Sequence, residues 1–366
     1  MERFQIIDTL RGIAIIGVFL YHALGASFGY DQLPWDGPWR SLDVSRTFFS
    51  AYPLTFGRLG VSLFFVISGF CIHWAFISKG SKNFKEFLTR RFYRIYPTYL
   101  IIYICVMGLV SLRMHLNGQT FIPTTADIVS HALLIHNFTI EHFLGINASL
   151  WSIAIEAQLY LLYPFLFAIA KRLGSWKKAV AVAVLIEISL RAAMSYFTLA
   201  GAMGDVRYIS QMPFTYWGSW ALGVIVAERV FHAPAVDPQV QMPFQLVIGV
   251  VLAASILISD WIQPLIQFQF LLASALAALF LQSLLSKKLG SYPKTKARQL
   301  LADIGIVSYS LYLIHQPILE WLWFIPGHPV LRFLSAILLL PCVFIIARLA
   351  YRHIELPTAA WGKGLR

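Results

Sequence analysis

The sequence predicts an all-α integral membrane protein, a polytopic bundle of about ten transmembrane helices. Its 366 residues are 58% hydrophobic and 13% charged, whereas about a quarter of the residues in a soluble domain are charged. The mean hydropathy is +0.68. Apolar runs of about twenty residues, the length that crosses a bilayer, recur along the chain. We therefore expect one transmembrane domain over residues 1–366 and no second, soluble domain.

Ten apolar stretches are long enough to cross the membrane. The first follows a short basic start and resembles a signal peptide, but it carries His22 and nine further stretches follow it. We expect this first stretch to be retained. The predicted spans are residues 10–29, 55–77, 95–112, 150–170, 177–198, 213–230, 244–262, 264–285, 302–325 and 331–351.

Basic residues cluster in the segments between alternate spans. If the N-terminus is cytoplasmic, most of the 29 Lys and Arg residues fall on the cytoplasmic side, as the positive-inside rule requires. An even number of spans then places both termini in the cytoplasm. These clusters account for the net charge of +12, so we expect no nucleic-acid partner. They lie in residues 79–94, 171–178, 287–298 and 348–366.

One further apolar stretch, residues 126–144, does not fit as a crossing, because it would move the basic turn at 171–178 to the outside. It contains several histidines, so we expect an interfacial or re-entrant helix on the outer side. The long outer segments 30–53 and 113–149 are candidates to hold a sugar or lipid head group, although an aromatic belt explains their tryptophans equally well. Their notable residues are Trp35, Pro38, Trp39 and Asn147.

No motif predicts a metal or a resident cofactor. Cys71, Cys105 and Cys342 lie inside apolar stretches, and their spacing matches no metal site and no disulfide framework. The chain also has no glycine-rich nucleotide-binding motif.

The first span carries two ionisable residues, Arg11 and His22. Eleven helical positions return almost to the same face, so both side chains point the same way, roughly 16 Å apart along the axis. His22 then lies near the middle of the bilayer. An ionisable group at that depth is costly to keep and suggests a functional site.

Five separated motifs resemble the acyltransferase 3 family of membrane O-acyltransferases, in that family's order. They are IDTLRGIAIIGVFLYH at 7–22, GVSLFFVISGF at 60–70, RRFYRIYP at 90–97, SLWSIAIEAQLYLLYP at 149–164 and YSLYLIHQP at 309–317. The resemblance implies transfer of an acyl group, usually acetyl, from cytosolic acyl-CoA to a hydroxyl of an extracytoplasmic acceptor. The implied acceptor is a cell-surface polysaccharide or glycolipid sugar. The resemblance also implies the bacterial cytoplasmic membrane, a stand-alone member without a fused extracytoplasmic domain, and no permanently bound cofactor.

Three arginines are the candidates to bind acyl-CoA. Arg91 and Arg94 begin the third span, and guanidinium groups suit phosphates because they donate two parallel hydrogen bonds. Arg11 shares a face with His22, and the distance between them resembles an extended pantetheine arm. We expect Asp8 to orient Arg11. The alternatives are that the cluster only sets topology and that Arg11 only anchors its helix end.

His22 is the candidate catalytic residue, because imidazole titrates near the working pH. It would deprotonate the acceptor hydroxyl or carry the acyl group as an acyl-imidazole, and the sequence leaves both routes open. We expect Glu156, roughly 9 Å below the outer edge against roughly 13 Å for His22, to orient the imidazole. A buried, protonated Glu156 is an equally good interpretation.

Other polar residues are expected to line or support this site: Ser68, Gln158, Tyr309, Ser310 and His315. Each is also explained as interhelical polar contact. Glu187 and Arg191, four residues apart, are interpreted as a structural pair.

Two other function classes compete with the enzyme. A multi-spanning transporter or flippase for a glycolipid or small molecule also carries intramembrane charge, but its inverted halves with interrupted helices are not visible. A receptor or assembly subunit would leave the alignment of Arg11 with His22 unexplained.

Overall fold

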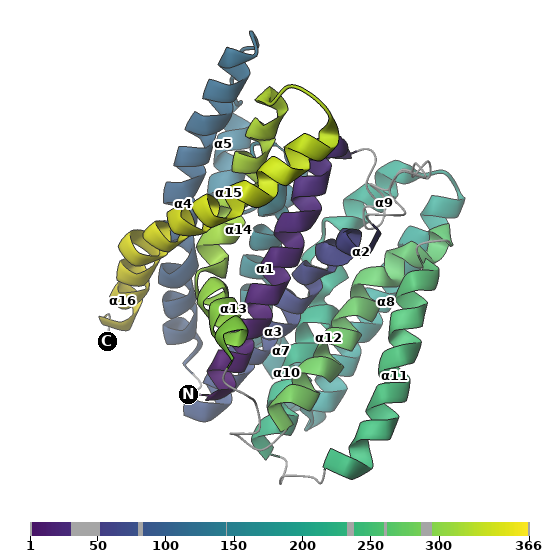
Figure 1. Cartoon of the computed structure of the whole chain (residues 1–366). Helices are drawn as coiled ribbons and strands as arrows, with labels where there is room; N and C mark the ends of the chain where they lie inside the picture. The colour runs from purple at the N-terminus through teal and green to yellow at the C-terminus, as the bar shows by residue number, and fades with distance from the viewer. Residues whose placement is uncertain are drawn as a thin grey trace.

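The computed structural model describes residues 2–30, 52–79, 83–143, 145–232, 238–259, 262–286 and 295–364. Within these ranges the chain forms helices and no strands, which confirms the predicted all-α class (Figure 1). The outer-loop residues Trp35, Pro38 and Trp39 lie outside the described ranges. The long helices are α1 (Glu2–Phe28), α3 (Gly60–Lys79), α4 (Phe84–Leu116), α7 (Trp151–Leu173), α8 (Trp176–Leu199), α10 (Trp217–His232), α11 (Pro238–Ser259), α12 (Gln269–Ser286), α14 (Ser308–Leu319) and α15 (Pro329–Ala350).

Shorter elements join or extend these helices. They are α2 (Tyr52–Thr55), η4 (Phe56–Leu59), α5 (Thr125–Ala132), η5 (His136–Phe138), α6 (Ile140–Phe143), η6 (Ala148–Leu150), α9 (Met203–Ser210), η7 (Pro213–Tyr216), η8 (Gln263–Phe268), α13 (Lys296–Ile306), η9 (Glu320–Phe324), η10 (Tyr351–Glu355) and α16 (Leu356–Gly364).

Seven helices in the described residues are long and apolar enough to cross a membrane. Many of their large apolar side chains are exposed, for example Leu161, Phe165 and Leu338, as expected where helices face lipid rather than water. The protein is therefore a helical membrane bundle. The count of ten spans stays a prediction, since α10 and α14 are shorter than a full crossing.

The predicted ninth span is not one continuous helix. Residues 302–325 are divided among α13, α14 and η9, and the helix breaks at Val307, whose ψ of 8° departs from the α-helical value. The break lets α13 run across the first helix while α14 takes a separate direction. Sequence periodicity continues through such a break, and this is why hydropathy predicted a single span.

Helix α1 lies at the centre of the bundle (Figure 1), and glycines let other helices approach it closely. A Cβ added at Gly305 of α13 would lie 1.7 Å from the carbonyl oxygen of Asp8 on α1. A Cβ added at Gly12 of α1 would lie 2.0 Å from the carbonyl oxygen of Leu301. The two backbones are in contact, so any larger residue would separate the helices. We call the end of the bundle where α1 begins the basic end and the opposite end the far end.

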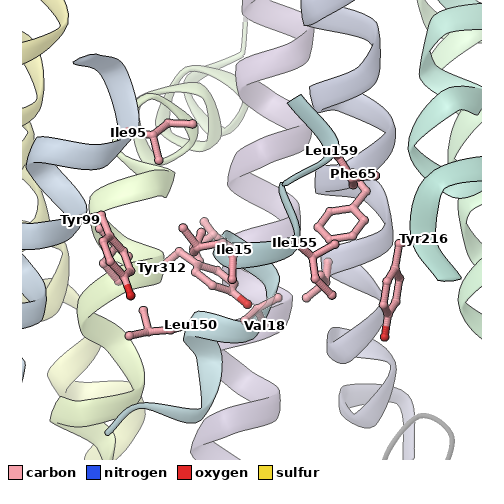
Figure 2. Packing of buried hydrophobic residues seen from close by; sticks show 14 of the residues in the cluster. Ile15, Val18, Phe65, Ile95, Tyr99, Leu150, Ile155, Leu159, Tyr216 and Tyr312 are labelled. Atoms are coloured by element: carbon pink, nitrogen blue, oxygen red, sulfur yellow. The ribbon is translucent and has the colours of Figure 1, made fainter. Parts of the chain in front are cut away.

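The apolar core surrounds α1 and links it to α3, α7 and α14. Figure 2 shows Ile15 and Val18 of α1 with Tyr312 of α14, and Phe65 of α3 beside Leu159 of α7. These buried side chains hold the polar groups that lie among the same helices in fixed positions.

Residues 126–143 form three short elements, α5, η5 and α6, which pack against α4 and α7. None of the three is long enough to cross a membrane, and the interfacial or re-entrant position of this stretch at the outer side stays a prediction. Tyr99 donates a hydrogen bond to the His131 carbonyl at 2.8 Å, and the Asn137 amide donates to Gln158 at 3.1 Å. The segment thus has a buried polar side that enters the bundle.

We expect acidification to destabilise this segment. His131 and His136 are buried with their rings stacked at 4.1 Å. Burial, and then the neighbouring His131, lowers the pKa of His136 from 6.5 to about 3, and burial also lowers the pKa of His131. Below about pH 6.5 these histidines bind protons in the unfolded chain but stay neutral in the folded segment. The free energy of unfolding is therefore constant above that pH and falls as the pH is lowered towards 3. At pH 5 the cost is about 2 kcal/mol for His136.

Hydrogen exchange of residues 125–143 at pH 7 and pH 5 measures this effect. Protection should fall on acidification in the wild type and much less in His136→Gln. Equal acid sensitivity of the two proteins would show that the buried imidazole is not its cause.

Candidate active site

A cavity of about 90 Å³ opens among α1, α3, α4, α7, α13, α14 and η10. Its apolar wall includes Phe64, Phe65 and Ile95. The polar lining consists of Arg11, Ser68, Cys71, Arg91, Arg94, Ser152, Glu156, Tyr160, Ser308, Tyr309, Tyr312 and Glu355. Six of these, drawn from five distant parts of the chain, were expected at the site from sequence alone: Arg11, Ser68, Arg91, Arg94, Glu156 and Tyr309.

The three predicted arginines share this cavity. Arg11 pairs with Asp8 at 3.6 Å, as expected from their spacing, and its guanidinium also lies 3.9 Å from the sulfur of Cys71. The Arg91 guanidinium lies over the ring of Tyr160 at 5.9 Å. Arg91 and Arg94 are one helical turn apart in α4, seven and ten residues after its first residue, Phe84. The arrangement concentrates positive charge at the basic end of the cavity.

A hydrogen-bonded chain of polar groups crosses the cavity wall and ends on Glu156. The Trp220 indole donates to Ser68 Oγ at 3.3 Å, and Ser68 Oγ lies 3.1 Å from the Tyr160 hydroxyl. Tyr160 in turn donates to the Glu156 carboxylate at 2.5 Å. Glu156 also interacts electrostatically with Arg11 and Arg91. The Glu156 carboxylate therefore supplies negative charge to Arg11 and Arg91. The predicted contact between Glu156 and His22 is not found among the contacts of the described residues.

His22 contacts a second histidine, His315. The two rings lie 4.9 Å apart, and His315 Nε2 is 3.2 Å from His22 Nδ1. Each Nδ1 also faces a carbonyl oxygen, that of Val18 for His22 at 2.9 Å and that of Tyr312 for His315 at 2.7 Å. A carbonyl only accepts, so both Nδ1 atoms carry hydrogen when the rings are neutral. His315 Nε2 is then an acceptor for His22, and the lone pair of His22 resides on Nε2.

Tyr312 separates the cavity from the histidine pair. Its side chain lines the cavity, and its ring lies 5.3 Å from that of His315 on the next helical turn. Ser152 Oγ donates to its hydroxyl at 2.7 Å, which ties α7 to α14. Figure 2 shows the Tyr312 ring beside Ile15 of α1. His22 is 8% exposed and is not part of the cavity lining.

The remaining predicted residues have mostly supporting contacts. Gln158 donates to the Leu134 carbonyl at 2.8 Å and so holds the 126–144 segment rather than lining the cavity. Tyr309 lines the cavity and donates to the Ile95 carbonyl at 2.9 Å, which joins α14 to α4. Ser310 donates to Glu355 at 2.8 Å.

The Glu187–Arg191 pair lies outside the cavity lining, as predicted. Arg191 Nε donates to Glu187 at 2.8 Å, and both side chains are buried. The Ser219 backbone and hydroxyl donate to the same carboxylate at 2.6 Å, while Arg191 donates to the Thr215 carbonyl at 3.0 Å. The pair thus fastens α8 to α10 and η7.

Sequence reasoning missed six polar residues of the cavity wall: Cys71, Ser152, Tyr160, Ser308, Tyr312 and Glu355. Ser152, Tyr160 and Tyr312 lie inside quoted motifs, and Cys71 and Ser308 directly adjoin one. Tyr160 follows Glu156 by four positions, so helical spacing could have found it. Glu355 follows the last predicted span among basic residues, where an acidic residue has no distinguishing signal. Within the described ranges, no group of three His, Cys, Asp or Glu side chains is arranged to hold a metal ion.

Comparison with known proteins adds a family and distant relatives. The acyltransferase domain family matches residues 4–352. The chain is 26% identical over 377 residues to the O-acetyltransferase OatA of Staphylococcus aureus (strain NCTC 8325 / PS 47), covering 96% of this chain and 56% of that protein. It is also 26% identical over 379 residues to the peptidoglycan O-acetyltransferase OatA of Listeria monocytogenes serovar 1/2a, covering 96% of this chain and 55% of that protein. The chain thus spans about half the length of these relatives. No solved structure matches it.

Proposed function

The chain belongs to the acyltransferase 3 family, and from that premise we propose that it is a membrane O-acyltransferase. It would move an acyl group, acetyl in the first instance, from cytosolic acyl-CoA to a hydroxyl of an acceptor beyond the membrane. The observation that carries the proposal is the cavity in which Arg11, Arg91 and Arg94 converge, with His22 and His315 directly behind its Tyr312 wall.

The arginines are suited to the donor. Coenzyme A carries a diphosphate and a third phosphate, and guanidinium groups bind phosphate oxygens through paired, charge-assisted hydrogen bonds. We assign the basic end of the bundle to the cytosol, because the Lys and Arg clusters that flank α3, α4, α7 and α8 lie there. The phosphates would stay at Arg91 and Arg94 while the pantetheine arm runs along α1 towards Tyr312.

His22 is assigned the acid–base role. In direct transfer, its Nε2 lone pair takes the proton of the acceptor hydroxyl, the oxygen attacks the thioester carbonyl, and the leaving thiolate takes up that proton. In the alternative route Nε2 attacks the carbonyl itself and CoA leaves as its thiolate; the acyl-imidazolium then passes the acyl group to the acceptor oxygen, and the hydroxyl proton of the acceptor converts the thiolate to the thiol. Both routes require the Tyr312 ring to move aside. We assign the orienting role to His315 instead of Glu156, because His315 Nε2 lies 3.2 Å from His22 Nδ1, the nitrogen whose hydrogen the Val18 carbonyl fixes.

The acceptor is proposed from chemistry and relatives together. His22 lies towards the far end of α1, where an acceptor from the extracytoplasmic side would arrive. One relative is named as a peptidoglycan O-acetyltransferase. We therefore propose a hydroxyl of a surface polysaccharide, peptidoglycan or glycolipid sugar, with the protein in the bacterial cytoplasmic membrane.

Removing the Arg91 guanidinium should weaken donor binding. The protein in nanodiscs is given acetyl-CoA, and release of free CoA thiol is followed with and without a glycan acceptor. For Arg91→Ala we expect the KM for acetyl-CoA to rise about 10- to 100-fold, the loss typical for a charge-assisted hydrogen bond. Arg90→Ala is the matched control, because Arg90 is the neighbouring residue, pairs with Glu86 and is not part of the cavity lining.

Equal KM values for Arg90→Ala and Arg91→Ala would contradict the assignment of the donor site. A folded wild-type protein that neither binds nor consumes acetyl-CoA would favour the transporter or flippase alternative. Binding without turnover would leave the donor site supported and point to a missing acceptor.

A further inference from the structure

Glu355 is a buried carboxylate in the donor cavity that neither the motifs nor the proposed chemistry uses. It ends η10, a turn of π-helix between α15 and α16, a distortion that is frequent at functional sites. Only 5% of the residue is exposed, yet it forms part of the cavity lining. Ser310 Oγ on α14 donates to its Oε2 at 2.8 Å.

Glu355 faces two of the three arginines without closing on them. It interacts electrostatically with Arg94 and Arg11. Among the described residues, however, no guanidinium nitrogen lies within 4.0 Å of its carboxylate. The hydrogen bond from Ser310 holds the Glu355 carboxylate against α14. A gap therefore remains between this carboxylate and the guanidinium groups of Arg94 and Arg11.

The carboxylates of the cavity balance its arginines. Asp8 pairs with Arg11 and also interacts with Arg94, Glu156 interacts with Arg91 and Arg11, and Glu355 interacts with Arg94 and Arg11 from within the cavity lining. Three guanidinium groups so close together repel one another and need counter-charge while the cavity is empty. A polyanionic ligand supplies that charge itself, and the fixed carboxylates then oppose it.

We propose that Glu355 is the resident counter-ion of the donor cavity and that it competes with the phosphates of coenzyme A for Arg94 and Arg11. This inference rests on the proposed use of acyl-CoA. While the cavity is empty, Glu355 neutralises the guanidinium groups across the gap. Once acyl transfer has left free CoA in the cavity, repulsion between Glu355 and the phosphates speeds its release. Glu355 is therefore a positioning residue that sets the affinity for the nucleotide part of the donor.

The test is the Kd of free CoA, measured by calorimetry on the full-length protein in nanodiscs. Glu355→Gln keeps the size and the hydrogen bond to Ser310 but removes the charge, so we expect binding about tenfold tighter. Coulomb's law gives roughly this effect for one unit charge a few ångströms from a phosphate in a partly hydrated site. The gain should shrink as salt is added. Product inhibition by CoA should strengthen in parallel.

Three variants make the result specific. Ser310→Ala frees the carboxylate to close on Arg94, so CoA should bind more weakly than to the wild type. Glu355→Asp keeps the charge and should show no tightening. Glu320 pairs with Arg113 at 2.7 Å and is not part of the cavity lining. Glu320→Gln removes one negative charge there and should leave the Kd for CoA unchanged.

The outcomes separate this inference from the proposed function. A wild type that binds CoA, together with weaker or unchanged binding by Glu355→Gln, would overturn the counter-ion role alone. Equal tightening by Glu320→Gln would overturn it as well, because the effect would then be one of net charge. A folded wild type that binds no CoA would overturn the proposed donor, and the counter-ion role with it.

Discussion

Replacing His22 with alanine is expected to reduce acyl transfer by about 100-fold or more, because a positioned acid–base group contributes factors of this size to the rate. His22 contacts His315, and its Nε2 carries the lone pair that takes the acceptor proton or attacks the thioester. The donor arginines are on other turns and helices, so the KM for acetyl-CoA should change far less than kcat. Thiol release and acetylated product, measured in nanodiscs, give both quantities.

The control is His232→Ala, because 63% of the His232 side chain is exposed and it lies outside the donor cavity. Both variants should keep the thermal midpoint of the wild type within a few degrees. Acetyl label that remains on the wild-type protein in the absence of acceptor, and is lost in His22→Ala, would identify the acyl-imidazole route. Full transfer activity in a folded His22→Ala protein would remove His22 from the mechanism.

Replacing Arg191 with methionine is expected to cost about 3–5 kcal/mol of stability, because it leaves Glu187 as an uncompensated buried charge. Glu187 is fully buried and accepts hydrogen bonds from Arg191 and from Ser219. Arg191 also donates to the Thr215 carbonyl, so its loss loosens the attachment of α8 to η7. Thermal unfolding of the purified variant measures the change.

The double variant Glu187→Met, Arg191→Met is the informative partner. It removes both charges and should recover much of the lost stability, since a buried ion pair replaced as a whole by apolar groups is often tolerated. Acyl transfer per folded molecule should stay near the wild-type value in both proteins, because neither residue lines the cavity. A double variant less stable than Arg191→Met would contradict this expectation. It would mean that the hydrogen bonds of Glu187 to the neighbouring helix stabilise the protein more than its unpaired charge destabilises it.

Much of the fold was predictable because a bilayer restricts what a chain can do. Long apolar runs must become helices there, and nine of the ten predicted spans correspond to a continuous helix or to a helix with a short 3₁₀ turn. The exception is the stretch from 302 to 325. Its break at Val307 lies two residues after Gly305, whose backbone contacts Asp8 on α1, and a contact between distant segments leaves no trace in local hydropathy.

The site was predictable where residue type alone limits position. Arg11 is costly inside a membrane unless it lines a polar cavity, and Arg91 and Arg94 carry guanidinium groups suited to phosphate where a span begins. All three line the same cavity. The partner of His22 was harder to predict. Depth estimates along two helices placed Glu156 level with His22, but depth says nothing of which neighbour lies sideways, and the tertiary packing brings His315 there. Glu355 was missed because its burial depends on the π-turn and on Ser310.

The central claim is that the arginine cavity holds acyl-CoA with its acyl group directed at His22. An experimental structure with an acetyl-CoA analogue, in which a methylene group replaces the thioester sulfur, tests it most directly. We predict phosphates on Arg91 and Arg94, the Tyr312 ring displaced, and the acyl carbonyl beside His22. Phosphates bound instead in the basic hollow formed by α7, α8 and α10, lined by Lys171, Lys177 and Arg229, with the arginine cavity unchanged, would contradict the claim.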